Sequence, residues 1–152
     1  MRLVVALFCL LPMAVFAQST WDTWEADGKT IAGICNDDVN ETCVVVYCEI
    51  ANGGAQIAFV SVGAWAVQAG AEEAMVLRIG AGDPQIIKGE IASAPGFGLE
   101  FYAVAAPLSP SQISGLRASS KFDLAVQNGA ATSLPLSGSS AAISRALAPS
   151  CG

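Results

Sequence analysis

The chain of 152 residues contains no histidine, and this absence excludes every mechanism that depends on an imidazole. No serine lies in a GxSxG segment, and Ser119-Ser120-Lys121 lacks the SxxK spacing that sets a lysine beside a serine on one helix face. Neither Gly80-Ala81-Gly82 nor Gly96-Phe97-Gly98 completes a phosphate-binding loop. The sequence therefore predicts a protein without a catalytic residue or a cofactor.

Basic residues are scarce as well, because seven Lys and Arg face thirteen Asp and Glu, which gives a formal net charge of -6. A negative chain repels nucleic acid and anionic lipid, so we expect neither as a partner. The acidic residues are scattered along the sequence, which is typical of a solvated surface.

A long apolar run occurs in one place, from Leu3 to Phe16, directly after the positive charge of Arg2. Ala17 follows it, and polar residues come next, which is the pattern of a cleavable secretory signal peptide. The run is shorter than the ~20 residues that a bilayer-spanning helix needs. We expect a signal peptide over 1–17, no membrane span in the mature chain, and a periplasmic or secreted bacterial protein.

The mature segment, 18–152, has the size of a single domain, and its cysteines are even in number: Cys35, Cys43, Cys48 and Cys151. An even set in an oxidising compartment predicts two disulfides. The absence of both histidine and a CxxC pair argues against zinc, so we expect no metal site. We therefore interpret 18–152 as one disulfide-containing, β-rich domain.

Short segments rich in β-branched and aromatic residues alternate with turn residues, and the clearest strand is Thr42–Ile50. Further strands are predicted at Thr20–Asp27, Thr30–Cys35, Gln56–Val62, Ala74–Ile79, Gln85–Ile91, Leu99–Val104, Lys121–Gln127 and Thr132–Leu136. A helix is expected from about Pro107 to Arg117, and Ser139-Ser140 are expected to cap a second one. The predicted fold is mainly β: an antiparallel β-sandwich or partly open barrel with two short helices near the C-terminus.

Alternation of side chains in a strand narrows the disulfide pairing. Cys43 and Cys48 lie five residues apart in one predicted strand, so they point to opposite faces and cannot bond without distorting it. Cys35 and Cys43 flank a polar turn and can face each other across a hairpin. This leaves Cys48 for Cys151, a bond that closes a loop of about a hundred residues and stabilises by about 4 to 5 kcal/mol at most.

The loop between the first two mature cysteines carries three carboxylates, on Asp37, Asp38 and Glu41. Their oxygens, with two neighbouring amides, are ligands of the kind that calcium takes. The spacing and length are not those of an EF-hand loop, which favours a solvated hairpin tip and a contact loop.

The three tryptophans carry the largest apolar side chains of the chain. Trp24 and Trp65 lie in strand-like stretches and are predicted to be core residues. Trp21, near the mature N-terminus, is predicted to be an exposed contact residue. Glu72-Glu73 and Arg78 are interpreted as surface charges.

The C-terminal third, PLSPSQISGLRASSKFDLAVQ followed by ATSLPLSGSSAAISRAL, resembles the end of the invasion-associated locus B family of exported bacterial proteins. A proline-led helix, a strand pair, an sLxGfxxAl-type turn and a final helix recur in that family. The matching residues here are Leu136, Ser137, Gly138, Ala142 and Leu147, whereas Ser139 replaces the usual aromatic residue. The resemblance implies a β-sandwich-like fold, export and a link to host-cell invasion, with no assigned enzymatic activity and no catalytic residues.

Three functions are compatible with these features. The first is a noncatalytic protein that binds an envelope or host macromolecule. The second is an inhibitor of a hydrolase such as lysozyme, in which the acidic loop would enter a cleft of a basic enzyme. The third is a hydrolase that uses carboxylates alone, which needs two Asp or Glu side chains at a suitable separation. We expect the first.

Peptide mapping without reduction tests export and the pairing together. Protein recovered from the periplasm is expected to give crosslinked peptides for Cys35–Cys43 and Cys48–Cys151, because the oxidising compartment and the strand faces both favour them. Free thiols, or a Cys43–Cys48 crosslink, would contradict the pairing.

Overall fold

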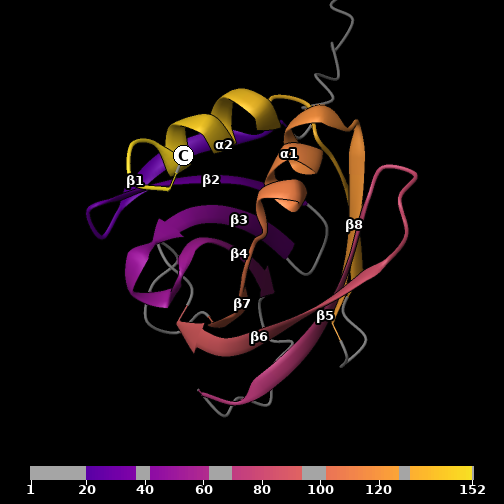
Figure 1. Ribbon diagram of the computed structural model, residues 1–152, viewed down its shortest axis with the longest axis horizontal. Helices are drawn as coiled ribbons and strands as arrows, with labels where there is room; N and C mark the ends of the chain where they lie inside the picture. The colour runs from indigo at the N-terminus through magenta and orange to yellow at the C-terminus, as the bar shows by residue number, and fades with distance from the viewer. Residues whose placement is uncertain (1–19, 37–41, 62–69, 94–101, 127–130, 152) are drawn as a thin grey trace, which may run out of the picture.

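The computed structural model describes residues 20–36, 42–61, 70–93, 102–126 and 131–151. Its strands are β1 (Asp22–Ala26), β2 (Lys29–Asn36), β3 (Thr42–Glu49), β4 (Gly54–Ser61), β5 (Glu72–Ile79), β6 (Gln85–Ser93), β7 (Tyr102–Pro107), β8 (Lys121–Val126) and β9 (Ala131–Pro135). Its helices are the 3-10 helix η1 (Ile50–Asn52) and the α-helices α1 (Pro110–Ala118) and α2 (Ser139–Leu147). The protein is therefore mainly β with two short helices late in the chain, as the sequence predicts (Figure 1).

All of these strands belong to one antiparallel sheet in the order β1-β2-β3-β4-β7-β6-β5-β8-β9. Trp21, just before β1, donates from its backbone N–H to the carbonyl of Ser137, just after β9, over 3.0 Å. Its indole Nε1–H donates to the carbonyl of Pro135, also over 3.0 Å. These bonds join the two outermost strands at one corner, so the sheet curls into a partly open barrel.

Trp21 is 5% exposed, and its ring centroid lies 6.0 Å from that of Phe122 in β8. The prediction that Trp21 is an exposed contact residue is therefore wrong. Its nearness to the mature N-terminus suggests exposure, but the closure of the sheet places the indole in the core, where its N–H has a partner.

The two α-helices lie together over one part of the curled sheet (Figure 1). Helix α2 packs on β1, β2 and β3 and contacts α1, which packs on β5. Neither is long and apolar enough to cross a membrane, and the same holds for every helix in the described ranges. The main core lies between helices and sheet, and its largest fully buried side chains include Ile57, Phe59, Met75, Leu77, Leu116, Phe122, Leu124 and Ile143.

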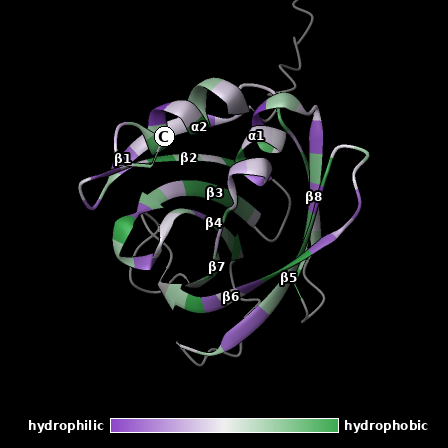
Figure 2. Cartoon of the chain, viewed as in Figure 1, coloured by the Kyte–Doolittle hydropathy of each residue, from purple (hydrophilic) through white to green (hydrophobic). Residues whose placement is uncertain are grey.

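The central strands are also buried on their other face, which explains the unbroken apolar run of β3. Val44, Val45 and Val46 are all 0% exposed, although successive side chains of a strand point to opposite faces. Ile31 and Val45 belong to a second apolar cluster, against which Trp24 packs. In Figure 2, hydrophobic residues follow β2, whereas β5 and β6 carry more hydrophilic ones.

Gly33 in β2 is required by close packing in this second cluster. A Cβ added there would lie 2.6 Å from Cη2 of Trp24 and 2.8 Å from Cγ1 of Val45. The indole of Trp24 therefore packs over this backbone, but Trp24 is only partly buried and covers the second cluster from outside, whereas the sequence predicts a core residue. Trp65 lies outside the described residues.

Helix α1 begins later than the sequence predicts. β7 continues to Pro107, and Ser109 is the N-cap of a helix whose first residue is Pro110. The Ser109 hydroxyl accepts from the backbone N–H of Gln112, whose side chain accepts in return from the backbone N–H of Ser109. This capping box and the N-terminal proline fix the start of the helix.

Helix α2 lacks the serine cap that the sequence predicts. Its N-cap is Gly138, with φ of 80°, and no side chain caps the helix. A Cβ at Gly138 would lie 3.1 Å from the carbonyl oxygen of Trp21. Glycine is therefore favoured at this position for two reasons: the backbone has a positive φ, and a side chain would be too close to Trp21. Ser139 instead donates from Oγ to the carbonyl of Leu116 over 2.7 Å and thereby links the two helices.

The two disulfides join Cys35 to Cys43 and Cys48 to Cys151. Cys35 and Cys43 are register partners of β2 and β3, with Cα atoms 4.0 Å apart. The pairing inferred from strand alternation is thus the one in the structure. The second bond spans 103 residues of sequence.

A pair of neighbouring serines tests the role of Ser139. Ser139→Ala is expected to lower the free energy of unfolding by about 1 to 3 kcal/mol, because the buried carbonyl of Leu116 loses its donor. Ser140→Ala, at an exposed position, is expected to change it by less than about 0.5 kcal/mol. Urea unfolding of both variants measures the difference, and equal effects would contradict this role for Ser139.

Candidate functional site

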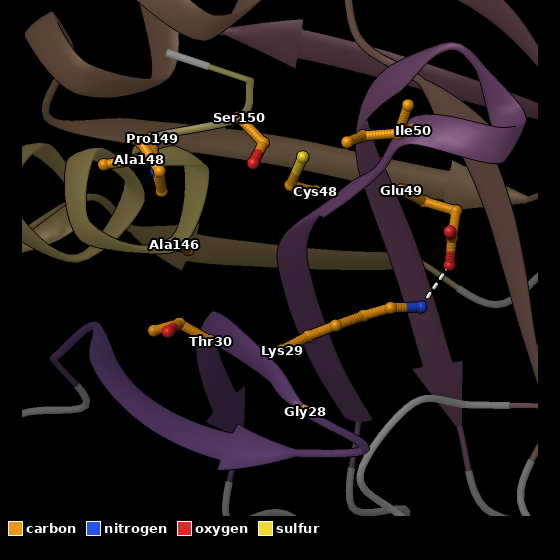
Figure 3. Close-up of a pocket in the computed structure, with 10 residues that line it drawn as sticks. All are labelled: Gly28, Lys29, Thr30, Cys48, Glu49, Ile50, Ala146, Ala148, Pro149 and Ser150. Carbon is orange, nitrogen blue, oxygen red and sulfur yellow. Dashed lines mark hydrogen bonds and ion pairs between the residues drawn. The ribbon is translucent and has the colours of Figure 1, made fainter.

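A surface hollow with a volume of about 420 Å³ lies where the C-terminal segment passes the end of β3. It is lined by the β1–β2 turn, by the junction of β3 with η1, and by the end of α2 with the residues after it (Figure 3). The lining residues are Gly28, Lys29, Thr30, Cys48, Glu49, Ile50, Ala146, Ala148, Pro149 and Ser150. These segments are distant in sequence, so the hollow exists only in the folded chain.

A second hollow, of about 380 Å³, shares Ile50 and Ser150 with the first. Its other lining residues come from the η1–β4 turn, the start of α1 and the C-terminal segment: Gly53, Gly54, Ala55, Leu108, Pro110, Ile113 and Cys151. We call these two hollows, with the side chain of Ile50 that borders both, the Ile50 surface.

The side chain of Ile50 is 71% exposed, although the backbone that carries it is held firmly. The N–H of Gly53 donates to the carbonyl of Ile50 over 3.3 Å. Gln56, only 3% exposed, donates from Nε2 to the carbonyl of Asn52 over 2.9 Å. A large apolar side chain therefore projects into solvent from an ordered turn, between the two hollows.

The disulfide Cys48–Cys151 ties the two sides of this surface together. Cys48 lies two residues before Ile50, and its Cα is 5.8 Å from that of Cys151. The backbone N–H of Cys151 donates to the carbonyl of Leu147 over 2.8 Å, so the C-terminal segment continues directly from α2. The segment 148–151 is thereby fixed against β3 and η1.

An ion pair between Lys29 and Glu49 forms one edge of the first hollow (Figure 3). Their side chains are 35% and 25% exposed. A pair at this exposure contributes at most about 1 kcal/mol to stability. Its main effect is to place one charge of each sign beside the exposed Ile50.

A third hollow, of about 460 Å³, lies on the face of the sheet opposite the helices. β3 and β4 contribute Tyr47 and Gln56, β5 and β6 contribute Glu72, Lys88 and Glu90, and the remaining lining residues are Asn52, Gly89, Ala92, Ala105 and Pro107. We call this the outer hollow. It gathers two carboxylates, an ammonium group, a phenol and two amides.

Tyr47 is 7% exposed, and burial raises its pKa to about 12, with the nearby charge of Glu49 as a second cause. The phenol therefore stays neutral at every physiological pH. It is a neutral group among the residues that line the outer hollow.

The contact loop predicted from the sequence, with Asp37, Asp38 and Glu41, lies outside the described residues. In the described ranges, no group of three or more Cys, Asp or Glu side chains is arranged to hold a metal ion. Glu72 and Glu90 are a cross-strand pair of carboxylates, of the general kind that a carboxylate-only hydrolase requires.

The predicted surface charges have different environments. Arg78 bonds to Oδ2 of Asp123 from Nε over 2.8 Å and from Nη2 over 2.5 Å. A hydrogen bond from Ser133 and then those from Arg78 lower the pKa of Asp123. Glu72 is exposed, but Glu73 is only partly so, and its Oε1 atom is buried with no hydrogen-bond partner in the described part of the chain.

Sequence reasoning did not identify Ile50, Tyr47 or the Glu72–Glu90 pair as site residues. A signal exists for Ile50, because a large apolar residue two positions before Asn52-Gly53-Gly54 sits at the start of a turn, where burial is uncommon. For Glu72 and Glu90 there is none, because their contact depends on the pairing register of β5 and β6.

Comparison with known proteins gives no relative from which a function can be transferred. No protein-family model, no curated protein and no solved structure matches the chain.

The raised pKa of Tyr47 predicts a loss of stability at alkaline pH. The folded pKa of about 12 exceeds the unfolded value of 10.0, so stability is fully present below pH 10 and is lost between pH 10 and 12. The loss attributable to Tyr47 is of the order of 2 to 3 kcal/mol. Urea unfolding from pH 8 to 12, with Tyr47→Phe as the comparison, measures it. A variant that loses as much stability as the native protein would contradict this assignment.

Proposed function

We propose that the protein is an exported, noncatalytic binding protein that recognises a protein partner of the bacterial envelope or of a host through the Ile50 surface. The supporting observation is the 71% exposure of Ile50 on a turn fixed beside the Cys48–Cys151 bond. Large apolar side chains held between concave regions are the usual anchors of protein interfaces. Because the backbone is already ordered, binding costs little conformational entropy.

The chemistry of the Ile50 surface favours a folded protein partner with apolar side chains at its centre. The second hollow is lined mainly by apolar and glycine residues, and the first has a charged edge at Lys29 and Glu49. An apolar centre with polar groups around it is the common composition of protein–protein interfaces. Ile50 would enter the partner, and partner side chains would fill the hollows.

The resemblance to the invasion-associated locus B family agrees with this proposal, since that family is exported and has no assigned enzymatic activity. The residues that carry the resemblance have structural roles here. Leu136 and Leu147 are buried, and Gly138 is the N-cap of α2. They support a shared C-terminal arrangement, and membership of the family is part of the proposal.

Inhibition of a hydrolase such as lysozyme is the alternative function. The acidic loop of Asp37, Asp38 and Glu41 would then be the contact, whereas the present proposal places the contact at Ile50. Inhibition by the native protein that disappears when the three loop carboxylates are replaced would favour the alternative.

Replacement of Ile50 tests the proposed function. The mature protein with intact disulfides is used to capture partners from envelope extracts and host-cell lysates. Ile50→Ser is expected to weaken capture of the specific partner by about thirtyfold, since central anchors contribute about 2 kcal/mol or more. Quantitative mass spectrometry of the captured proteins, followed by titration of the purified partner, measures the effect.

Ile86→Ser is the matched control, because Ile86 is 75% exposed in β6 and lines neither hollow of the Ile50 surface. The Ile86→Ser variant is expected to capture the partner as well as the native protein does. Equal loss in both variants, or no loss in Ile50→Ser, would contradict binding at Ile50. Hydrolysis of a cell-wall glycan that stops when Glu72 or Glu90 is replaced by glutamine would favour an enzyme instead.

A further inference from the structure

Strand β9 lies at one end of the sheet, and most of its outer edge has no partner strand. Neighbouring strands are antiparallel throughout the order of nine, so β1 and β9, the first and the last, run in the same direction. Trp21, just before β1, bonds to the carbonyls of Pro135 and Ser137 at the end of β9. The two strands therefore meet end to end, and within the described residues no strand covers the rest of the β9 edge.

The hydrogen bonds to β8 show which backbone groups of β9 point to this free edge. The N–H of Leu136 donates to the carbonyl of Ser120 over 2.9 Å, in line with the register of the two strands. In an antiparallel pair, every second residue bonds to the neighbouring strand, and the residues between them point away from it. The N–H and C=O groups of Ala131 and Ser133 therefore point away from β8. The carbonyl of Pro135 does the same when it accepts from the indole.

This edge lacks the protection that free strand edges usually have. Ala131 and Ser133 are exposed, and no described group bonds to their outward N–H and C=O groups. Free edges are usually protected by charged side chains or by a covering element. β1, at the other end of the sheet, has both, namely Asp22 and Glu25 and a contact with α2. β9 has no charged residue, and Pro135 protects only its last position, so the edge can accept a further strand.

Thr132, between the two outward residues, supplies a second and independent observation. Its side chain lies on the inner face of the sheet with that of Leu134, which is 3% exposed. The Oγ1 atom of Thr132 is buried and has no hydrogen-bond partner in the described part of the chain. Buried polar atoms are normally hydrogen-bonded. A strand added to β9 would place a residue opposite Thr132, with Cβ atoms about 4.5 to 5.5 Å apart, where it can offer the missing partner.

We propose that β9 pairs with β9 of a second copy of the chain, antiparallel and around a two-fold axis at Thr132. In this register Ala131 of each copy faces Ser133 of the other, and each copy donates two backbone hydrogen bonds and accepts two. The two Thr132 side chains lie opposite each other, in the position where threonine pairs form hydrogen bonds across strands. Both copies use the same groups, so the contact closes as a dimer.

The threonine pair is what favours a second copy over an unrelated strand. Any extended chain can bond to the outward backbone groups of β9, whereas a copy also brings a hydroxyl to the unpartnered hydroxyl of Thr132. The contact lies apart from the Ile50 surface and does not depend on the function proposed there, because no residue of β9 lines either hollow of that surface.

Sedimentation equilibrium of the mature protein with intact disulfides tests the dimer. One strand pair is smaller than the roughly 1,200 Å² or more that stable interfaces bury, so we expect a reversible dimer. A monomer–dimer equilibrium is expected between micromolar and millimolar concentration, without larger species. A protein that stays monomeric throughout this range would overturn the proposal.

Two substitutions of Ser133 separate the backbone from the side chain. Ser133→Pro removes an outward N–H from each copy and leaves the pairing with β8, which does not use that N–H. We expect the dissociation constant of the dimer to rise about tenfold or more. Ser133→Ala is the matched control: it removes the hydroxyl, which bonds to Asp123, keeps the N–H, and is expected to leave dimerisation unchanged. Equal dimerisation of the native protein and Ser133→Pro, or equal losses in the two variants, would contradict pairing through this edge.

Thr132→Val keeps the shape of the side chain and removes its hydroxyl. It is expected to weaken the dimer about fivefold, because the hydrogen bond between the threonines is lost. Its monomer is expected to unfold in urea no more easily than the native monomer, because the hydroxyl has no partner there. A less stable monomer with unchanged dimerisation would show a structural role only and would contradict an axis at Thr132.

Cysteine crosslinking tests the register. Under mild oxidation Thr132→Cys is expected to form a disulfide-linked dimer quickly, because side chains directly opposite each other have nearly the Cβ separation of a disulfide. Ser133→Cys is the control, since the two Ser133 residues are not opposite each other, and faster crosslinking there would contradict the axis. If Ser133→Pro failed to fold, these two variants would still decide. A dimer that is lost in Ile86→Ser but kept in Ser133→Pro would place the contact on the exposed face of β6 and overturn the proposal.

Discussion

The bond between Cys48 and Cys151 is the constraint on which the proposed binding surface depends. The segment after α2 has little else to hold it: residues 148–150 are exposed, and the backbone bond from Cys151 returns to α2 itself. Without the disulfide, the segment that lines one side of the Ile50 surface would be free to move away from β3. The bond thus makes the segment after α2 one wall of the Ile50 surface.

The rest of the molecule holds β3, to which the segment after α2 is bonded, in a fixed position. A single antiparallel sheet curls until Trp21 closes the corner between its first and last strands, and the helices cover the interior that the curl creates. The central strands are buried on both faces, so β3 is held firmly in the sheet. Both disulfides are attached to this strand, since Cys43 and Cys48 each lie in it. One disulfide joins β3 to β2, its neighbour in the sheet, and the other joins β3 to the segment after α2.

Most of the fold follows from local patterns in the sequence, because strands and their turns are short and have strong composition signals. The pairing of Cys48 with Cys151 follows from two local arguments: Cys43 and Cys48 cannot share a face of one strand, and Cys35 and Cys43 flank a polar turn. Contacts between distant segments could not be predicted in this way. The burial of Trp21 depends on the meeting of two sheet edges, and the cap of α2 depends on the distance between Gly138 and Trp21. The juxtaposition of Glu72 and Glu90 depends on register, and the exposure of Ile50 depends on what packs around η1.

The most direct test compares amide hydrogen exchange in the native protein and in a Cys48→Ser/Cys151→Ser variant. If the disulfide holds the Ile50 surface on an independently stable sheet, protection is expected to fall at the amides of Gly53 and Cys151, which are bonded to Ile50 and Leu147. The amides that pair β3 with β4 and β6 with β7 are expected to remain protected relative to global unfolding. Uniform loss of protection across the sheet, or unchanged protection at Gly53 and Cys151, would contradict this role of the disulfide.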